Sequence, residues 1–301
     1  MSGKQRIWRP GFAVDLGQVL GPLTRGADPT SSWDGGLWRA FRTPAGIGTL
    51  RITAHPGDGE VSATAWGPAA DWLLERIPAL LGAGDTPDGL VLPPGPLRDV
   101  QRRHPGLRLG ATGLVLDALV PAVLEQKVTV TEAHRGWRYL VRRFGNPAPG
   151  PHPHLRVTPS ARDWAAIPSW EWHRAGVDPK RSGTVLRAVR LAPRLEEAAA
   201  MSSPDAFARL TTVPGIGVWT AAEALQRANG DPDAVSVGDY HLANHVGYAL
   251  TGRARSTDDQ MLELLAPYAG QRHRVCRLVR LAGLRAPRFG PRLQPNDHRH
   301  R

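Results

Sequence analysis

The chain has almost no cysteine and no long apolar segment, and each absence excludes a class of protein. Cys276 is the single cysteine among 301 residues, so neither an internal disulfide nor a four-cysteine iron–sulfur site can form. Residues 1–6 lack the apolar core of a secretion signal, and no apolar run approaches the length that crosses a bilayer. We therefore expect a reduced cytoplasmic protein with no membrane partner.

Lysine and acidic side chains are scarce relative to arginine. Lys and Arg total 38 against 27 Asp and Glu, and nearly all of the basic residues are arginine, which gives a formal net charge of +11. A balance of this size favours a polyanionic partner such as nucleic acid, although it is silent about the fold. The arginine bias also fits a purely genomic cause, so charge alone does not define the function.

Residues 1–96 differ in pattern from the rest of the chain. Apolar and polar residues alternate in three segments, as they do in half-buried strands: 37–43, 48–53 and 60–66. The helical spacing of apolar residues in 68–81 predicts one helix over a face of this sheet. We therefore expect an N-terminal antiparallel α+β domain, followed by a Pro/Gly-rich link over 85–96.

Beyond residue 97 the apolar positions recur at helical spacing, which predicts a helical region over 97–284. Within it, 179–195 is predicted as one basic amphipathic helix, and three tryptophans are predicted to be core or cleft aromatics: Trp164, Trp170 and Trp172. Residues 285–301 are basic, rich in proline and without periodicity, as in a disordered tail. The predicted fold class is mostly α with an N-terminal α+β domain.

A Pro-Gly-Ile-Gly turn separates two helical patterns between Leu210 and Ala221. Pro214 fixes one backbone angle, whereas Gly215 and Gly217 allow positive φ and the close approach of another backbone. A helix that starts directly behind Gly217 would point its free N–H groups out of the turn, an arrangement that suits a phosphate. On its own this sequence is also a common structural turn.

A second feature lies at Lys127, which follows an apolar helical stripe over 116–124. An unbroken helix would bury this lysine without a partner, which is costly. Thr129 and Glu132 instead have the spacing of a capping box, so we predict a break between Glu125 and Thr129, with Gln126 and Lys127 exposed in it. A solvated lysine at a helix junction is the simpler interpretation of Lys127.

The hairpin, the helix behind it and the loop Val237-Gly238-Asp239 together resemble the helix-hairpin-helix DNA glycosylase superfamily, whose members usually carry Gly-Pro-Asp in this loop. The pattern is most similar to the bacterial 3-methyladenine DNA glycosylase II type, the AlkA type. This resemblance implies two helical subdomains around a cleft within 97–284, and a monomer in the bacterial cytoplasm that meets the nucleoid through its DNA. Asp239 is also a good N-cap for the helix that follows it.

The resemblance implies a monofunctional DNA glycosylase of base excision repair. Such an enzyme flips a damaged, here alkylated, base out of double-stranded DNA and hydrolyses its N-glycosidic bond, leaving an abasic site. Asp239 would be the catalytic carboxylate that stabilises positive charge on the sugar and orients water. Trp219 occupies the position where bifunctional relatives carry the lysine that cuts the strand. The alternatives are a non-catalytic helix-hairpin-helix protein that binds damaged or unusual DNA, and a bifunctional glycosylase/lyase.

The same resemblance assigns the remaining site residues. Trp219 and Glu223 would line the base pocket, although Trp219 could equally pack behind the hairpin. The break would contact DNA through Gln126 and Lys127, with Lys127 at the position of a residue that wedges into the duplex. The hairpin would bind phosphate through the backbone of Thr212, Pro214, Gly215, Ile216 and Gly217.

The family's hairpin carbonyls also hold a monovalent cation, here those of Thr211, Val213 and Ile216, and no other cofactor is implied. The closing helix carries His273 and Arg277 without the expected aromatics. If that helix lines the pocket, the pocket is more polar than in AlkA-type enzymes, and we expect either a preferred lesion other than 3-methyladenine or a low activity.

Overall fold

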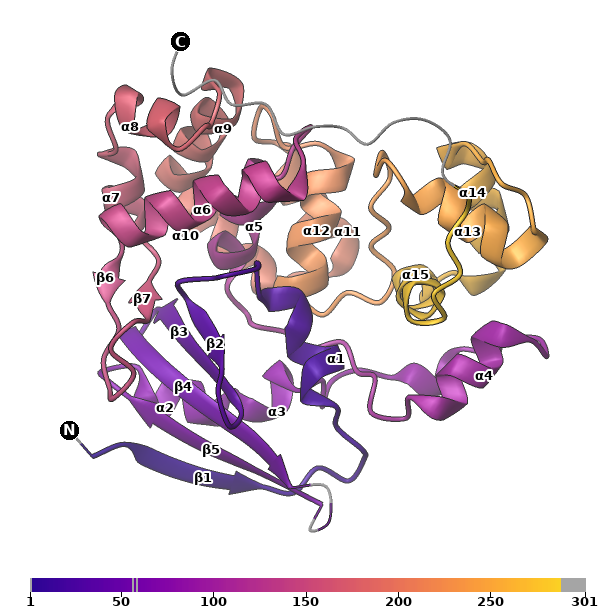
Figure 1. The fold of residues 1–301 in the computed structure, drawn as a ribbon, viewed down its shortest axis with the longest axis horizontal. Coiled ribbons are helices and arrows are strands. Elements are labelled where there is room, and N and C mark those ends of the chain that lie inside the picture. Colours follow the sequence, from indigo (N-terminus) through magenta and orange to yellow (C-terminus); the bar gives the residue numbers. More distant parts are fainter. Residues whose placement is uncertain (1, 56, 58, 288–301) are drawn as a thin grey trace.

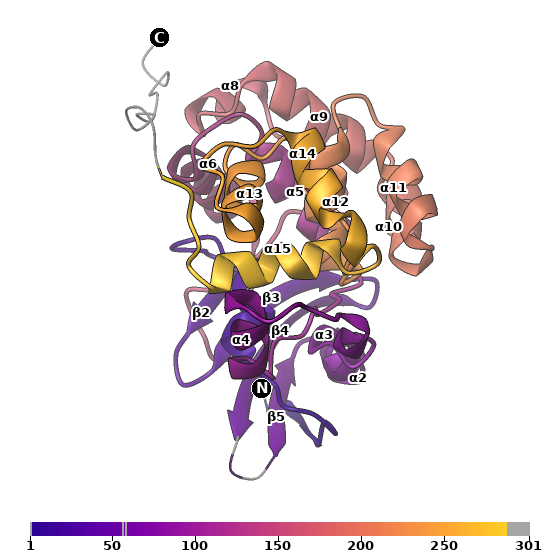
Figure 2. The same ribbon diagram turned by 90° about the vertical axis from the view of Figure 1, so that its right-hand side faces the viewer.

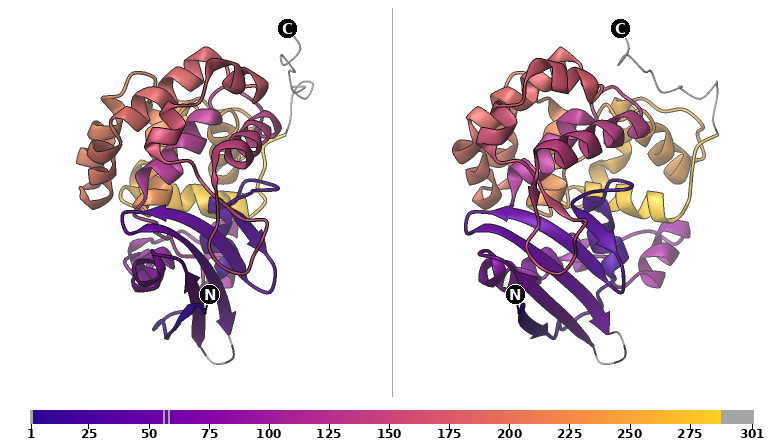
Figure 3. Two further views of the ribbon diagram at one scale, coloured as in Figure 1. Left: turned by 90° about the vertical axis from the view of Figure 1, so that its left-hand side faces the viewer. Right: turned by 60° about the vertical axis from the view of Figure 1, so that its left-hand side comes forward.

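The structure is a computed structural model, and it describes residues 2–55, 57 and 59–287. Most of the predicted tail, residues 288–301, lies outside the described residues. Helices make up most of the regular structure, and a single five-stranded antiparallel sheet lies at one end of the molecule (Figure 3). The prediction of a mostly helical chain with an N-terminal antiparallel sheet is confirmed. In the described ranges no helix is both long enough and apolar enough to cross a membrane.

The sheet has the strand order β1-β5-β4-β3-β2. Its strands are β1 (Lys4–Trp8), β2 (Ser31–Trp33), β3 (Leu37–Thr43), β4 (Gly46–His55) and β5 (Glu60–Trp66). Two of the predicted strands, 37–43 and 60–66, match β3 and β5 in full, and the third is longer than predicted at both ends. Alternation was a sufficient signal there because each of these strands buries one face, as Leu50 and Ile52 do on either side of Arg51.

Short helices cover the sheet and complete its core. They are α1 (Leu16–Leu20), the 3-10 turn η1 (Gly21–Leu23), α2 (Ala70–Glu75) and α3 (Ile77–Leu80). The single helix predicted over 68–81 is therefore wrong in detail. Pro78 stands in the first turn of α3, where its missing N–H costs nothing, whereas inside one continuous helix it would remove a hydrogen bond.

A first group of helices shares one core. It contains α5 (Val115–Leu124), α6 (Val130–Phe144), α7 (Ala161–Ala165), α8 (Ser169–Arg174), α9 (Pro179–Arg190), α10 (Ala192–Glu196), η3 (Glu197–Ala200), α11 (Ser203–Thr211) and α12 (Val218–Ala228). The predicted helix over 179–195 divides at Leu191, because Pro193 starts α10. Trp164 and Trp172 are buried as predicted, whereas Trp170 is 61% exposed and belongs to neither a core nor a pocket. A two-stranded sheet of β6 (Asn146–Pro147) and β7 (Arg156–Val157) lies between α6 and α7.

A second group has a core of its own and joins distant parts of the sequence. Its members are η2 (Pro87–Gly89), α4 (Pro96–Arg103), α13 (Leu242–Thr251), α14 (Asp258–Leu265), η4 (Ala266–Tyr268) and α15 (Arg272–Leu281). Figure 2 shows α4 directly beneath α15. A buried ion pair between Asp85 and Arg274 connects the chain just before η2 to α15. The 229–241 segment joins the two groups and runs between α12 and α13 (Figure 1).

Candidate functional site

The hairpin between α11 and α12 has the predicted shape, but its two glycines differ. Gly215 has a φ of +96°, and a Cβ atom there would come within 2.2 Å of Thr184 Oγ1. Gly217 has a φ of −96°, and a Cβ atom there would meet no atom within 4 Å. Only Gly215 is therefore required by the backbone. Gly217 instead keeps open the space in front of α12.

The residues of the hairpin alternate between the core and the surface. Val213 and Ile216 are buried in the core of the first helical group, whereas Pro214, Gly215 and Gly217 are exposed. Gly217 is the N-cap of the 11-residue helix α12, and no side chain caps the free N–H groups of the first turn. The positive end of a helix with uncapped, outward N–H groups is suited to bind an anion.

Two side chains from outside the hairpin hold it through its carbonyl groups. Gln126 Nε2 donates to the carbonyl of Gly215 at 2.9 Å and to Thr220 Oγ1 at 2.8 Å. Arg187 Nε donates to the carbonyl of Pro214 at 2.9 Å. Gln126 is consequently half-buried, so the prediction that it is exposed is wrong. The sequence could not show this, because the partner lies far along the chain.

The predicted break between α5 and α6 is confirmed. Helix α5 ends at Leu124, and Thr129 and Glu132 form both halves of the capping box that starts α6. Lys127 is exposed and has a φ of +53°, the single positive φ outside glycine within the described ranges. This left-handed residue turns the chain between two helices that share one core, and it leaves the lysine side chain outside that core.

Asp239 lies near the end of the 229–241 segment and is half-buried. Its Oδ1 accepts the backbone N–H groups of His241 at 2.9 Å and Leu242 at 2.8 Å, where α13 begins. The N-cap of α13 is His241, so the prediction that Asp239 is the N-cap is wrong by two residues, although its carboxylate does accept the N–H groups at the start of that helix. Capping also fixes the carboxylate and uses Oδ1 alone, so Oδ2 remains available for chemistry.

Glu223 has partners that were not anticipated. Its carboxylate pairs with Arg227 Nη1 at 2.8 Å and accepts the hydroxyl of Ser236, and the Glu223 side chain is 14% exposed. Burial alone would raise the pKa of Glu223, but Arg227 and Ser236 outweigh it and hold the pKa below its ordinary value. The Glu223 carboxylate is therefore engaged with two partners within the chain, and its place in a base pocket stays a prediction.

Trp219 is the second residue of α12 and is partly exposed. Its side chain is absent from the core of the first helical group, which contains Ile216 and Ala221 on either side of it. Both the pocket role of Trp219 and its packing behind the hairpin stay predictions.

The closing helix α15 buries His273 and Cys276, and its Arg277 forms a hydrogen bond within the protein. Burial and the neighbouring Arg277 hold the pKa of His273 well below its ordinary value, so this imidazole is neutral. Burial and nearby arginines lower the pKa of Arg277 to about 10, and its Nη2 donates to the carbonyl of Gln18 at 2.7 Å. Arg277 therefore links α15 to α1. Burial raises the pKa of Cys276 to about 12, so its thiol stays protonated.

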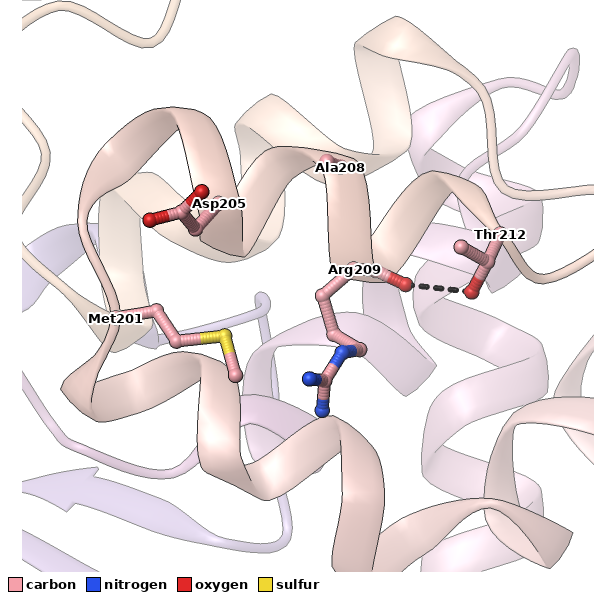
Figure 4. A pocket seen from close by; sticks show the side chains of 5 residues that line it. All are labelled: Met201, Asp205, Ala208, Arg209 and Thr212. Atoms are coloured by element: carbon pink, nitrogen blue, oxygen red, sulfur yellow. Dashed lines mark hydrogen bonds between the residues drawn. The ribbon is translucent and has the colours of Figure 1, made fainter.

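An open depression of about 430 Å³ lies beside α11 (Figure 4). Its lining consists of Met201, Asp205, Ala208, Arg209 and Thr212. Thr212 is the one hairpin residue in this lining, and its hydroxyl donates to the carbonyl of Arg209 at 2.7 Å. Neither Trp219 nor Asp239 borders it. The depression is thus separate from the two elements that carry the predicted chemistry.

No family model matches the sequence. A curated protein of Mycobacterium tuberculosis, described as a probable bifunctional transcriptional activator/DNA repair enzyme AlkA, is 31% identical over 217 residues, which cover 69% of this chain and 43% of that protein. The chain thus spans less than half the length of this relative.

Solved structures show the same fold over nearly the whole chain. A 3-methyladenine DNA-glycosylase from Archaeoglobus fulgidus has a TM-score of 0.77 and 17% identity, with 92% of this chain and 98% of that chain covered. An 8-oxoguanine glycosylase/lyase from Clostridium acetobutylicum, solved with double-stranded DNA, has a TM-score of 0.71 and 8% identity, with 93% and 97% covered. The chain is thus similar in sequence to an AlkA-type repair enzyme over 69% of its length, and nearly its whole length has the fold of these DNA glycosylases.

Proposed function

We propose that the chain is a monofunctional DNA glycosylase of base excision repair, acting as a monomer in the bacterial cytoplasm on double-stranded DNA that contains alkylated bases. The observation that carries this proposal is the placement of Asp239. It follows the hairpin by one helix and one loop, and backbone N–H groups hold one of its oxygens at 2.8 and 2.9 Å. A carboxylate fixed in this way is preorganised to act on a nucleotide flipped out of the duplex.

The reaction needs little beyond this carboxylate. As the bond between base and sugar breaks, positive charge develops on the sugar, and Asp239 stabilises that charge and orients the attacking water through its free oxygen. An alkylated purine carries positive charge itself and leaves readily, so a strong general acid is not required.

DNA would be held by backbone groups of the hairpin rather than by base-specific contacts. The exposed turn and the uncapped N-terminus of α12 offer N–H groups to a phosphate. The carbonyls of Pro214 and Gly215 are already occupied by Arg187 and Gln126. By the family resemblance a monovalent cation would use the carbonyls of Thr211, Val213 and Ile216, which are neutral oxygen donors suited to such an ion, and it would stiffen the turn. Lys127 would enter or flank the duplex from the break.

Strand cleavage is not part of the proposed activity. A lyase of this family needs an amine beside the sugar, and the position that supplies it carries the indole of Trp219. The Archaeoglobus neighbour is a 3-methyladenine glycosylase and the Clostridium neighbour a glycosylase/lyase, so the fold accommodates both chemistries. Borohydride treatment of the enzyme with damaged DNA should trap no covalent complex, whereas a trapped complex would identify a lyase.

The test of the proposal is base release from methylated DNA by the wild type and by Asp239→Asn. Asparagine caps helices as well as aspartate does, so α13 should remain intact while the rate falls by about 100-fold or more. Asp15→Asn is the matched control, because the Asp15 carboxylate also accepts a backbone N–H at the start of a helix, that of Gln18 in α1. Wild-type protein that binds DNA but releases no base from methylated, deaminated or oxidised DNA would favour a non-catalytic binding protein.

A further inference from the structure

We infer that Glu223 and Gln226 are positioning residues that fix the loop of Asp239 through the hydroxyl of Ser236. This inference rests on the proposed function. It assigns no contact with the substrate to either residue. Both side chains project from α12, the helix that starts at the hairpin, and both reach the segment that ends at Asp239.

The Ser236 hydroxyl is held from two sides. It donates to Glu223 Oε1 and accepts from Gln226 Nε2 at 2.8 Å, and Ser236 as a whole is 6% exposed. Gln226 Nε2 also donates to the carbonyl of Ala234 at 2.8 Å. Because the hydroxyl is both a donor and an acceptor here, its orientation is fixed, and the backbone on either side of it is tied to α12.

The connection from Ser236 to the reacting group is short. The backbone N–H of Asp239 donates to the carbonyl of Ser236 at 3.2 Å, so a single turn joins the two residues. A hydrogen-bonded anchor on the side of α15 lies further away, at Asp233, whose Oδ1 is 2.8 Å from Arg272 Nε. Ser236 is therefore the anchor closest to the carboxylate on the side of α12.

The charge of Glu223 makes this anchor strong. Arg227 keeps the carboxylate ionised although the side chain is largely buried, and a hydroxyl that donates to an ionised acceptor forms a stronger hydrogen bond than one that donates to a neutral acceptor. Arg227 Nε in turn donates to the carbonyl of Pro22 at 3.1 Å. Arg227 thus connects the support of the loop to the N-terminal part of the chain as well as to α12.

Loss of this anchor should slow the reaction without weakening DNA binding. The hairpin that would bind phosphate is held separately, by Gln126 and Arg187. A small displacement of a catalytic carboxylate is costly, since a shift of about 1 Å reduces rates by roughly 100-fold. A role confined to stability would instead lower both the rate and the melting temperature without a selective effect on the chemical step.

The experiment compares Ser236→Ala with Ser236→Thr in full-length protein. The single-turnover rate of base release should fall at least 10-fold in Ser236→Ala, with an unchanged Kd for abasic DNA, and Ser236→Thr should recover most of the rate because it keeps the hydroxyl. Ser160→Ala is the matched control, because the Ser160 hydroxyl also donates to a carboxylate, Asp163, at 2.6 Å but at the start of α7. It should leave the rate unchanged.

Two further measurements separate failure of this inference from failure of the proposed function. Glu223→Gln alone should lower the rate of base release. Combined with Ser236→Ala it should lower the rate little further, because both substitutions act on the hydrogen bond between Ser236 and Glu223. Amide hydrogen exchange at residues 234–239 should be faster in Ser236→Ala even if no base is ever released. A wild-type rate in Ser236→Ala, a rate loss matched by an equal loss of DNA binding, or unchanged exchange would each overturn the inference. An inactive wild type would instead overturn the proposed function, leaving exchange to decide the role of Ser236.

Discussion

The hairpin precedes α12 in the chain and the Asp239 loop follows it, and the two elements are held in different ways. The hairpin is gripped through its backbone carbonyls, by Gln126 and Arg187, and it presents backbone N–H groups. The loop is held through a side-chain hydroxyl, that of Ser236, as well as through the carbonyl of Ala234, and it presents a side chain. An element that works through its backbone is recognisable from a local pattern of Pro and Gly. An element that works through one side chain depends on partners elsewhere in the sequence.

The largest effect on stability is expected at the ion pair of Glu223 and Arg227, because this pair supports the loop and is largely buried. Arg227→Met leaves the Glu223 carboxylate without its ion pair in a site where it is 14% exposed, which should lower the free energy of unfolding by about 3–5 kcal/mol. Chemical denaturation measures this. Arg209→Met is the control, because Arg209 pairs with Glu197, whose side chain is 58% exposed, and should cost less than about 1 kcal/mol. Similar losses in both variants would contradict the contrast.

Substitution of the two hairpin glycines should have different effects, one on the stability of the protein and the other on its binding to DNA. Gly215→Ala forces a Cβ atom against Thr184 at a positive φ, so it should lower the free energy of unfolding by about 1–3 kcal/mol. Gly217→Ala meets no atom within 4 Å and should leave stability nearly unchanged, yet it should weaken DNA binding several-fold by placing a methyl group where a phosphate approaches. Denaturation together with DNA titration at fixed salt gives both quantities. Equal destabilisation by the two substitutions would show that the glycines are not distinct.

The smallest expected effect is a difference between the loop and the hairpin in how far acid weakens their hydrogen-exchange protection. Arg227 and Ser236 hold the pKa of Glu223 below its ordinary value of 4.5. The stability that the ionised Glu223 gives to the loop is therefore fully present above pH 4.5 and is lost as the pH falls through the lowered pKa. Gln126, which holds the hairpin at the carbonyl of Gly215, has no ionisable group. Hydrogen-exchange protection of the Asp239 amide should therefore decline in acid before that of Ile216, whose N–H donates to Val213 at 3.0 Å. A parallel decline would argue against a separate support for the loop.

Much of the fold could be read from the sequence where a pattern is local. Alternation located β3 and β5 to the residue, and the cost of burying Lys127 located the break between α5 and α6. Prolines inside two apolar stripes, Pro78 and Pro193, were not given enough weight, and each stripe proved to be two helices. The strands β1 and β2 were missed because β1 is mostly polar and exposed and β2 has three residues, so neither shows a clear alternation.

The candidate site was less predictable than the fold. The hairpin and Asp239 were found from their motifs. Glu223 was assigned to a pocket, although its spacing to Arg227 on one helix face was a readable sign of an ion pair. The contact of Gln126 with Gly215 and the hold on Ser236 could not be predicted, because they depend on how α5, α12 and the loop pack together.

The membership of α4 in the second helical core has a consequence for synthesis on the ribosome. A nascent chain that has emerged to residue 228 already holds the residues of the sheet core and nearly all those of the first helical core. The apolar side of α4, with Leu97 and Val100, gains its partners when residues 235–284 follow. Because domains fold as their residues emerge, α4 should remain undocked until the closing helices arrive, and the Asp239 loop should be the last part to become ordered.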